Sequence, residues 1–144
     1  GTWERNVERA VYIPGPRPPS DLVTLYQFSA LPDGWTRFFL TSTNAQGAPT
    51  FQLATFKVDG QIRPWHDQNT LGLFMATGQQ TNLTRSYRRI DATTIEFTGY
   101  TGGVAGLPTV RALLPDGNTY TQTVRGTNAQ GVAVNNVLVF ERVR

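Results

Sequence analysis

Cysteine is absent from this 144-residue sequence, and histidine occurs once, as His66. Without cysteine there is no disulfide framework, no thiolate nucleophile and no cysteine-based metal site. Zinc takes about four N, S or O ligands, and one imidazole without an H-x-x-x-H spacing does not supply them, so we predict no metal site. The phosphate-binding motifs G-x-x-x-x-G-K-[ST] and G-x-G-x-x-G and the nucleophile motif G-x-S-x-G are also missing. We therefore predict no cofactor.

Long apolar runs and clusters of charge are absent as well. The longest apolar run, around Val137 to Phe140, has the length of a strand, whereas about 20 apolar residues are needed for a helix to span a bilayer. We predict no integral membrane association. The 13 basic residues are spread along the chain, and only Arg88 and Arg89 are adjacent. Because a nucleic-acid surface needs clustered basic residues, we predict no nucleic-acid partner despite the net charge of +3.

The length fits one domain, which we assign to residues 1–144. The composition, 39% hydrophobic and 11% aromatic with 16% charged residues, is typical of a globular chain. Because the chain starts at Gly1 rather than at a methionine, the compartment stays open. We expect a periplasmic or secreted protein if a signal peptide has been removed, and a cytoplasmic one otherwise.

Turn residues punctuate the sequence at regular spacing, and two turn motifs occur twice. Residues 31–34 (Leu-Pro-Asp-Gly) recur at 114–117, and residues 43–47 (Thr-Asn-Ala-Gln-Gly) recur at 127–131. Proline presets the φ of a turn and glycine allows positive φ, so each motif should reverse the chain. Between the turns lie segments rich in Thr, Val, Phe and Tyr, the pattern of a β-meander. We predict strands at 2–7, 21–29, 35–43, 49–58, 61–65, 81–89, 93–100, 108–114, 118–126 and 133–143.

Aromatic residues occur on both faces of these strands, which favours a partly hollow barrel over a dry sandwich. We therefore predict an all-β fold, a single antiparallel up-and-down β-barrel of eight to ten strands with at most one short helix. That helix should lie within 67–79, where Asn69 or Thr70 could cap it and Leu71, Phe74 and Met75 share a face. We favour a lid over the cavity mouth for this segment; the alternative is a segment packed on the outside.

The chain also resembles small bacterial lipocalin-like barrel proteins. Gly1-Thr2-Trp3 matches the G-x-W signature of the first lipocalin strand, and Arg142 resembles the last-strand arginine that covers that tryptophan. Further similar segments run along the whole chain, at 14–18, 59–60, 89–91 and 126–137, while the longer stretch 65–82 departs from the pattern. The resemblance implies a calycin-type barrel with a pocket for a lipophilic or aromatic compound. It implies no catalytic residue.

The first functional hypothesis is a binding protein that holds a small hydrophobic or aromatic molecule in the barrel cavity. Arg37 shares a strand face with two aromatic residues, so it is either an anchor for a ligand carboxylate or an outward member of a salt bridge. Whether the chain forms a homodimer is left open. The residues expected to contact the ligand are Trp35, Arg37, Phe39, Phe56, Trp65, Phe74, Met75, Tyr100 and Tyr120.

The alternative hypothesis is a cofactor-free enzyme, an isomerase, cyclase, lyase or hydratase, that works in the same cavity. His66 and Asp67 could exchange a proton with a substrate, with Tyr87 as an inward hydroxyl. Neighbouring residues on a strand point to opposite faces, so the first two can act together only where the chain turns. A structural, exposed histidine is the competing interpretation.

Overall fold

The computed structural model describes residues 1–18, 23–44 and 46–144. Within these ranges it contains eleven strands, one α-helix and a short 3-10 turn at Pro32–Gly34. The elements are β1 (Thr2–Val11), β2 (Thr24–Ala30), β3 (Trp35–Thr43), β4 (Pro49–Lys57), β5 (Arg63–Pro64), α1 (Gln68–Thr77), β6 (Leu83–Arg89), β7 (Thr94–Thr101), β8 (Val104–Ala105), β9 (Thr109–Leu113), β10 (Thr119–Thr127) and β11 (Ala133–Arg142).

The predicted all-β antiparallel fold is confirmed, with one strand more than the upper expectation. The addition is β8, a two-residue strand that folds back on β7. Such a short strand lacks the alternating pattern that identifies longer ones. The strand expected at 21–29 corresponds to β2, and its first two residues lie outside the described ranges.

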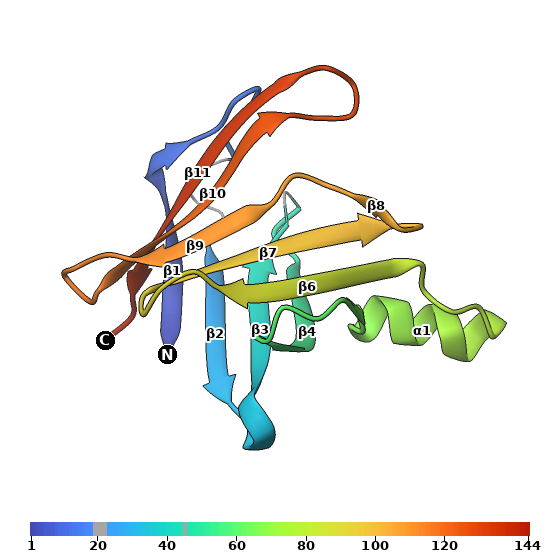
Figure 1. Cartoon of the computed structure of the whole chain (residues 1–144). Helices are drawn as coiled ribbons and strands as arrows, with labels where there is room; N and C mark the ends of the chain where they lie inside the picture. The colour runs from blue at the N-terminus through green and yellow to red at the C-terminus, as the bar shows by residue number, and fades with distance from the viewer. Residues whose placement is uncertain (19–22, 45) are drawn as a thin grey trace.

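All strands belong to one sheet in the order β4-β3-β2-β1-β11-β10-β9-β7-β6-β5, in which adjacent strands are hydrogen-bonded; β8 pairs with β7 beside this path. The first and last strands pair with each other, so the two termini lie side by side (Figure 1). Strands β6, β7 and β9 cross over β2, β3 and β4 in this view, which wraps the sheet around an interior. Trp3 faces Arg142 in the β1–β11 register, and the guanidinium lies 4.8 Å from the ring centroid. The expected cation–π pair is therefore present.

The sheet is not closed by a complete ladder, because β4 and β5 lie at its two ends. In the described residues, one isolated bridge links Ala54 of β4 to Asp67, which lies between β5 and α1. The side chain of Gln68 extends this bridge: its Oε1 accepts a 2.8 Å hydrogen bond from Leu53 N, and its Nε2 donates a 2.7 Å bond to Phe51 O. One carboxamide thus occupies a backbone donor and a backbone acceptor on the edge of β4.

The repeated turn motifs form matching hydrogen bonds. Asn44 N donates to Ala48 O and Asn128 N donates to Val132 O, both at 2.9 Å. In each turn the asparagine Oδ1 also accepts a 2.9 Å bond from the backbone N–H of that same downstream residue, Ala48 or Val132. An asparagine carboxamide that bonds its own turn explains why the same residues serve twice.

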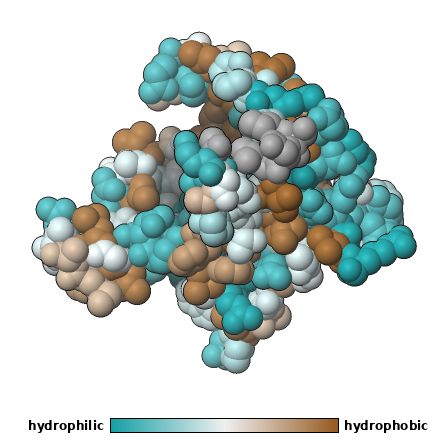
Figure 2. Space-filling model, turned by 180° about the vertical axis from the view of Figure 1, so that it is seen from behind, coloured by the Kyte–Doolittle hydropathy of each residue, from teal (hydrophilic) through white to brown (hydrophobic). Residues whose placement is uncertain are grey.

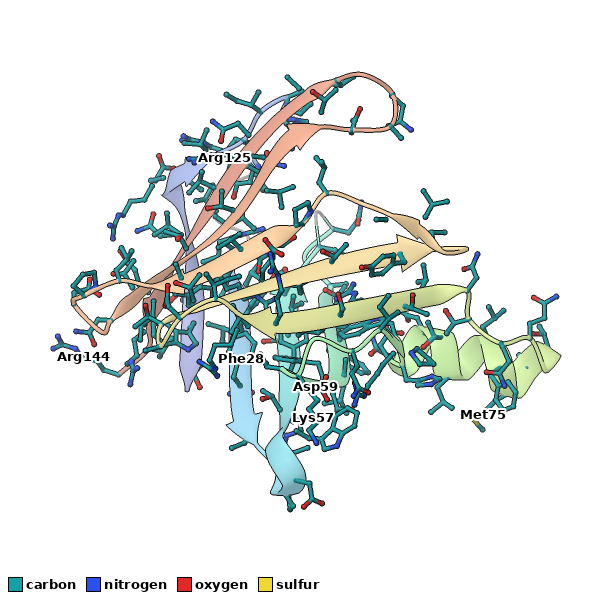
Figure 3. All side chains as sticks on the ribbon, viewed as in Figure 1. Phe28, Lys57, Asp59, Met75, Arg125 and Arg144 are labelled. Carbon is teal, nitrogen blue, oxygen red and sulfur yellow. The ribbon has the colours of Figure 1, made fainter. Side chains whose placement is uncertain are left out.

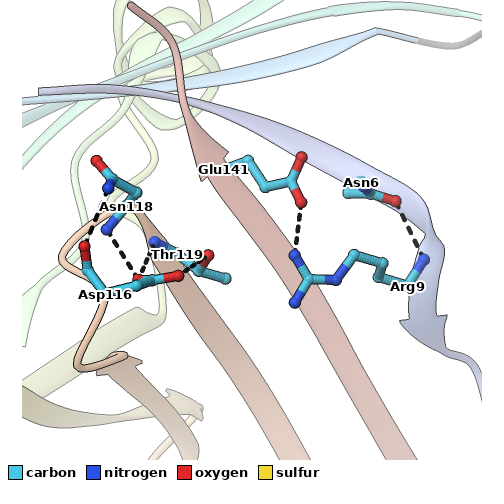
Figure 4. A network of polar contacts seen from close by, with 6 residues as sticks. All are labelled: Asn6, Arg9, Asp116, Asn118, Thr119 and Glu141. Carbon is cyan, nitrogen blue, oxygen red and sulfur yellow. Dashed lines mark hydrogen bonds and ion pairs between the residues drawn. The ribbon is translucent and has the colours of Figure 1, made fainter.

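Polar contacts hold together the end of the barrel at which β10 begins and β11 ends. Arg9 Nη1 pairs with Glu141 Oε1 at 2.6 Å, and Arg9 N donates to Asn6 Oδ1 at 3.1 Å (Figure 4). In the turn before β10, Thr119 Oγ1 donates a 2.7 Å bond to Asp116 Oδ2. The first contact joins β1 to β11, and the Thr119 bond closes the turn between β9 and β10.

Aromatic side chains form the core. One buried cluster contains Phe38, Ala54, Phe56, Trp65 and Tyr87, and a second contains Trp3, Tyr120 and Phe140. Tyr26 and Phe28 from β2 pack against both clusters, so a continuous aromatic interior runs through the barrel.

The predicted helix is present as α1, but its cap and its packing differ from expectation. Asp67, rather than Asn69 or Thr70, is the N-cap, because its carboxylate reaches the free amides of the first turn. None of the residues in α1 is buried. The helix projects away from the sheet beside β4 and β6 (Figure 1), so it is neither a lid nor a segment packed on the outer surface.

Candidate functional site

A cavity of about 310 Å³ reaches into the aromatic interior. Its walls come from β1, β2, β3, β4, β9 and β10, and the ends of β6 and β7 with their connecting turn border it through Arg89, Ala92, Thr93 and Ile95. The volume lies at the lower end of the roughly 300–1,000 Å³ of small-molecule sites. The interior residues that line it include Trp3, Phe28, Phe56, Arg111, Leu113 and Tyr120.

Arg111 is the central polar residue of this cavity. It stands opposite Gln122 in the β9–β10 register, and its Nε donates a 2.8 Å hydrogen bond to Gln122 Oε1. Its guanidinium carbon lies 4.8, 5.3 and 5.8 Å from the ring centroids of Phe97, Phe28 and Phe38. Burial lowers the pKa of Arg111 below its usual value, but a guanidinium stays protonated in proteins. The cavity therefore carries a permanent positive charge.

A second arginine does not line this cavity but lies close enough to Arg111 to help lower its pKa. Arg85 on β6 lies 3.7 Å from the ring centroid of Trp65 and 5.8 Å from that of Phe97, and its Nη1 is 3.4 Å from the hydroxyl of Tyr87. A third, Arg5 on β1, has a buried Nε without a hydrogen-bond partner among the described residues.

No carboxylate in the described part of the chain forms a salt bridge with Arg5, Arg85 or Arg111. The salt bridges in the described residues are formed by other arginines near the surface, namely Arg9, Arg17, Arg63 and Arg88. Charges that are buried without an opposite charge cost free energy. The interior is thus electrostatically suited to an anion.

Tyrosine hydroxyls provide neutral donors in the same region. Burial raises the pKa of Tyr26 and of Tyr120, although nearby Arg111 opposes the shift in both cases. Both side chains therefore remain protonated at neutral pH and can donate a hydrogen bond. The hydroxyl of Tyr120 is buried and has no partner among the described residues.

Four of the residues expected from the sequence lie in this interior. Phe56, Trp65, Tyr87 and Tyr120 are all buried. Tyr87 stacks between Phe56 and Phe97, with ring centroids 4.2 and 5.0 Å away. Phe56 and Tyr120 line the cavity, whereas Trp65 and Tyr87 belong to the core cluster beside it.

Three other expected residues lie on the outer face of β3. Phe38 is buried and pairs with buried Ala54, so Trp35, Arg37 and Phe39, which alternate with it, point the other way. Arg37 and Phe39 border an outer groove of about 580 Å³. Arg37 is exposed and donates a 3.5 Å bond to Ser29 Oγ, so it points outward, but it forms no salt bridge with the described residues.

Tyr100, Phe74 and Met75 also lie away from the interior. Gly99 pairs with Arg85, so Tyr100, the next residue of β7, faces the opposite side of the sheet. Phe74 is 43% exposed and Met75 is 78% exposed. Figure 3 shows Met75 on the projecting helix, far from Phe28.

The proposed pair His66 and Asp67 is separated by its surroundings. His66 is exposed, whereas Asp67 is buried. The carboxylate of Asp67 accepts bonds from Asn69 N, Thr70 N, Gln52 Nε2 and Trp65 Nε1 at 2.9 to 3.0 Å. Burial alone would raise the pKa of Asp67, but these bonds outweigh it and hold the pKa below its ordinary value. The residue caps α1 and fixes Trp65.

The arginines and phenylalanines that meet in the interior are not predicted by the sequence pattern. Arg85, Arg111, Phe28, Phe38 and Phe97 come from five different strands. Alternation groups residues within a strand, but it does not reveal which arginines of different strands meet. A usable signal was the lone arginine between apolar neighbours in 109–113, Thr-Val-Arg-Ala-Leu.

The antiparallel sheet and its aromatic interior define a calycin-type β-barrel. Among solved structures, a variant of the fluorescent protein UnaG is similar, with a TM-score of 0.58 and 13% sequence identity over 100% of this chain and 95% of that chain. At this identity the similarity concerns the fold. No protein-family model and no curated protein matches the sequence. In the described residues, no helix is long and apolar enough to cross a membrane.

Proposed function

We propose that the barrel interior binds a small apolar or aromatic molecule that carries an acidic group. The observation that carries the proposal is the half-buried guanidinium of Arg111, surrounded by Phe28, Phe38 and Phe97 without a carboxylate partner among the described residues. A ligand acid would supply the missing negative charge, and the ligand's rings would contact the aromatic walls.

Two energetic contributions favour such a ligand. Apolar surface removed from water contributes about 25 cal/mol per Å², which favours a hydrophobic body. A charge-assisted hydrogen bond contributes about 1.5–3 kcal/mol, and in a water-poor site it also orients the ligand. The volume of about 310 Å³ suits a compact ring system rather than a long chain.

The test compares two fluorescent probes with the same ring system. Anilinonaphthalene sulfonate carries an acidic group, and phenylnaphthylamine is its neutral counterpart. The chain should bind the sulfonate, and Arg111→Met should weaken that affinity by about 10- to 100-fold, the equivalent of roughly 1.5–3 kcal/mol. The affinity for the neutral probe should change by less than about threefold, a difference of roughly 0.7 kcal/mol.

Arg37→Met is the matched control, because Arg37 lies on the outer face and should not affect either probe. If Arg111→Met does not fold, Arg85→Met removes the neighbouring positive charge on β6. It should also weaken binding of the sulfonate more than binding of the neutral probe. Equal loss for both probes, or loss with the Arg37 variant alone, would refute an interior anion site.

A cofactor-free enzyme is not proposed as a second function. Asp67 is occupied by four donors as a helix cap, and the exposed side chain of His66 does not join it in a cavity.

A further inference from the structure

The cavity that Arg111 lines has another arginine at its rim, Arg89 at the end of β6. Arg89 pairs with Ile95 across β6 and β7, and Ile95 pairs with Arg111 across β7 and β9. Residues directly opposite each other in a sheet share a face, so the two arginines lie in one row on the inner face. Two strand spacings separate their backbones, which is about 10 Å.

The side chain of Arg89 lies beside the turn between β6 and β7. It is exposed, and its Nη1 donates a 3.5 Å hydrogen bond to the carbonyl of Ala92, which lines the same cavity. The preceding residue, Arg88, pairs with Glu96 at 2.8 Å. Because adjacent residues of a strand point to opposite faces, Arg88 is on the outside and Arg89 is directed to the cavity.

The protein supplies no opposite charge to this cavity. Among its described lining residues there is no Asp or Glu, and neither Arg89 nor Arg111 forms a salt bridge within residues 1–18, 23–44 and 46–144. The acid nearest to Arg89 in the sequence is Asp91, whose Oδ1 accepts bonds from the amide and the hydroxyl of Thr93 at 2.8 and 3.0 Å. Two cations therefore face one cavity without a carboxylate partner.

We propose that the ligand of the interior is a diacid, an aromatic body with two acidic groups at opposite ends. One acid pairs with Arg111 in the aromatic interior, and the other reaches Arg89 at the rim. The spacing of the row requires a ring system between the two acids, because adjacent acids would reach only one arginine. The inference rests on the proposed function, since it adds a second anionic contact to the same cavity.

The two contacts differ in their exposure to water. Arg111 is half-buried and Arg89 is exposed. The β6–β7 turn lies on the side of the molecule away from α1 (Figure 1), and this side is predominantly hydrophilic in the space-filling view (Figure 2). Salt screens exposed pairs more than partly buried ones. The outer acid should therefore contribute less than the inner one and depend more on salt.

The test compares three naphthalene carboxylates by isothermal titration calorimetry at pH 7, where their carboxyls are ionised. 2-Naphthoate carries one acid, naphthalene-2,6-dicarboxylate carries two at opposite ends, and naphthalene-2,3-dicarboxylate carries two side by side. We expect the 2,6-diacid to bind about fivefold more tightly than either of the others, which corresponds to roughly 1 kcal/mol for an exposed ion pair. High salt should reduce this preference.

Variants of Arg89 assign the preference to one residue. Arg89→Met should abolish the preference for the 2,6-diacid and change the affinity for 2-naphthoate by less than about twofold, roughly 0.4 kcal/mol. Arg89→Lys retains the charge and should retain most of the preference. Arg89→Gln serves if Arg89→Met does not fold. Arg88→Met is the matched control, because it removes the same charge from the outer face of the same strand.

Three results would overturn the diacid and leave the proposed function intact, provided that 2-naphthoate still loses affinity in Arg111→Met. They are a 2,6-diacid that binds no more tightly than 2-naphthoate, equal affinities for the 2,3- and 2,6-diacids, and a preference that Arg89→Met and Arg88→Met change equally. If no naphthalene carboxylate binds, or if 2-naphthoate binding ignores Arg111→Met, the proposed function fails and the diacid fails with it.

Discussion

Arg111 and Gln122 face each other across β9 and β10, and one 2.8 Å hydrogen bond between Nε and Oε1 joins them. Glutamine orients the guanidinium without neutralising it. The aromatic interior therefore retains a cation that has no carboxylate partner among the described residues.

A carboxylate placed next to Arg111 should neutralise the charge of its guanidinium within the protein. Gln122→Glu keeps the size and the hydrogen-bonding position of the side chain but adds an acid, so the site would no longer favour an anion. We expect the affinity for anilinonaphthalene sulfonate to fall by about tenfold, roughly 1.4 kcal/mol, with the affinity for phenylnaphthylamine unchanged. Fluorescence titration measures both, and an unchanged sulfonate affinity would contradict the role given to Arg111.

Arg142 should stabilise the barrel through the ring of Trp3. Arg142→Met removes the cation–π contact, which contributes about 1 kcal/mol, and should lower the melting temperature by roughly 4 °C. Arg144→Met is the control at the exposed C-terminus. Thermal unfolding followed by circular dichroism checks the prediction, and equal melting temperatures for the two variants would show that the contact adds nothing.

Asp67 should be a stability residue. Asp67→Ala removes a helix cap, worth about 1 kcal/mol, and leaves Trp65 Nε1 and Gln52 Nε2 without an acceptor, at about 1–3 kcal/mol. A loss of about 2–4 kcal/mol is expected in urea unfolding. A loss below about 0.5 kcal/mol, the size of an ordinary surface substitution, would mean that the bonds to Asp67 are dispensable.

The contribution of Asp67 should also depend on pH. Its folded-state pKa lies below the ordinary 3.8, so its stabilisation is present above about pH 4 and is lost as the pH falls through the folded-state value. The difference in unfolding free energy between wild type and Asp67→Asn should shrink from pH 7 to pH 3. A difference that stays constant over this range would contradict the charged role.

Turn chemistry made most of the fold predictable. Glycine and proline at 31–34, 59–60 and 114–117 mark chain reversals, and the segments between them alternate as strands do. The two-residue strand β8 is too short to carry such a pattern, and the contact between β4 and Gln68 depends on a side chain that bonds a distant backbone. These contacts form only after the sheet has curled into the barrel.

The candidate site was harder to predict, because β3 carries aromatic residues on both faces. Alternation separates Phe38 from Phe39 but does not say which one is inside. Pairing across the sheet decides it, since Phe38 lies opposite Ala54 and Phe28. The expected anchor Arg37 therefore points outward, and Arg111 takes the interior position.

A crystal structure of the chain with bound anilinonaphthalene sulfonate tests the central claim most directly. The rings should lie in the cavity beside Phe28 and Phe56, with a sulfonate oxygen within hydrogen-bond distance of an Arg111 nitrogen. A probe seated instead in the outer groove beside Arg37 and Phe39, with the interior filled by side chains alone, would contradict the account.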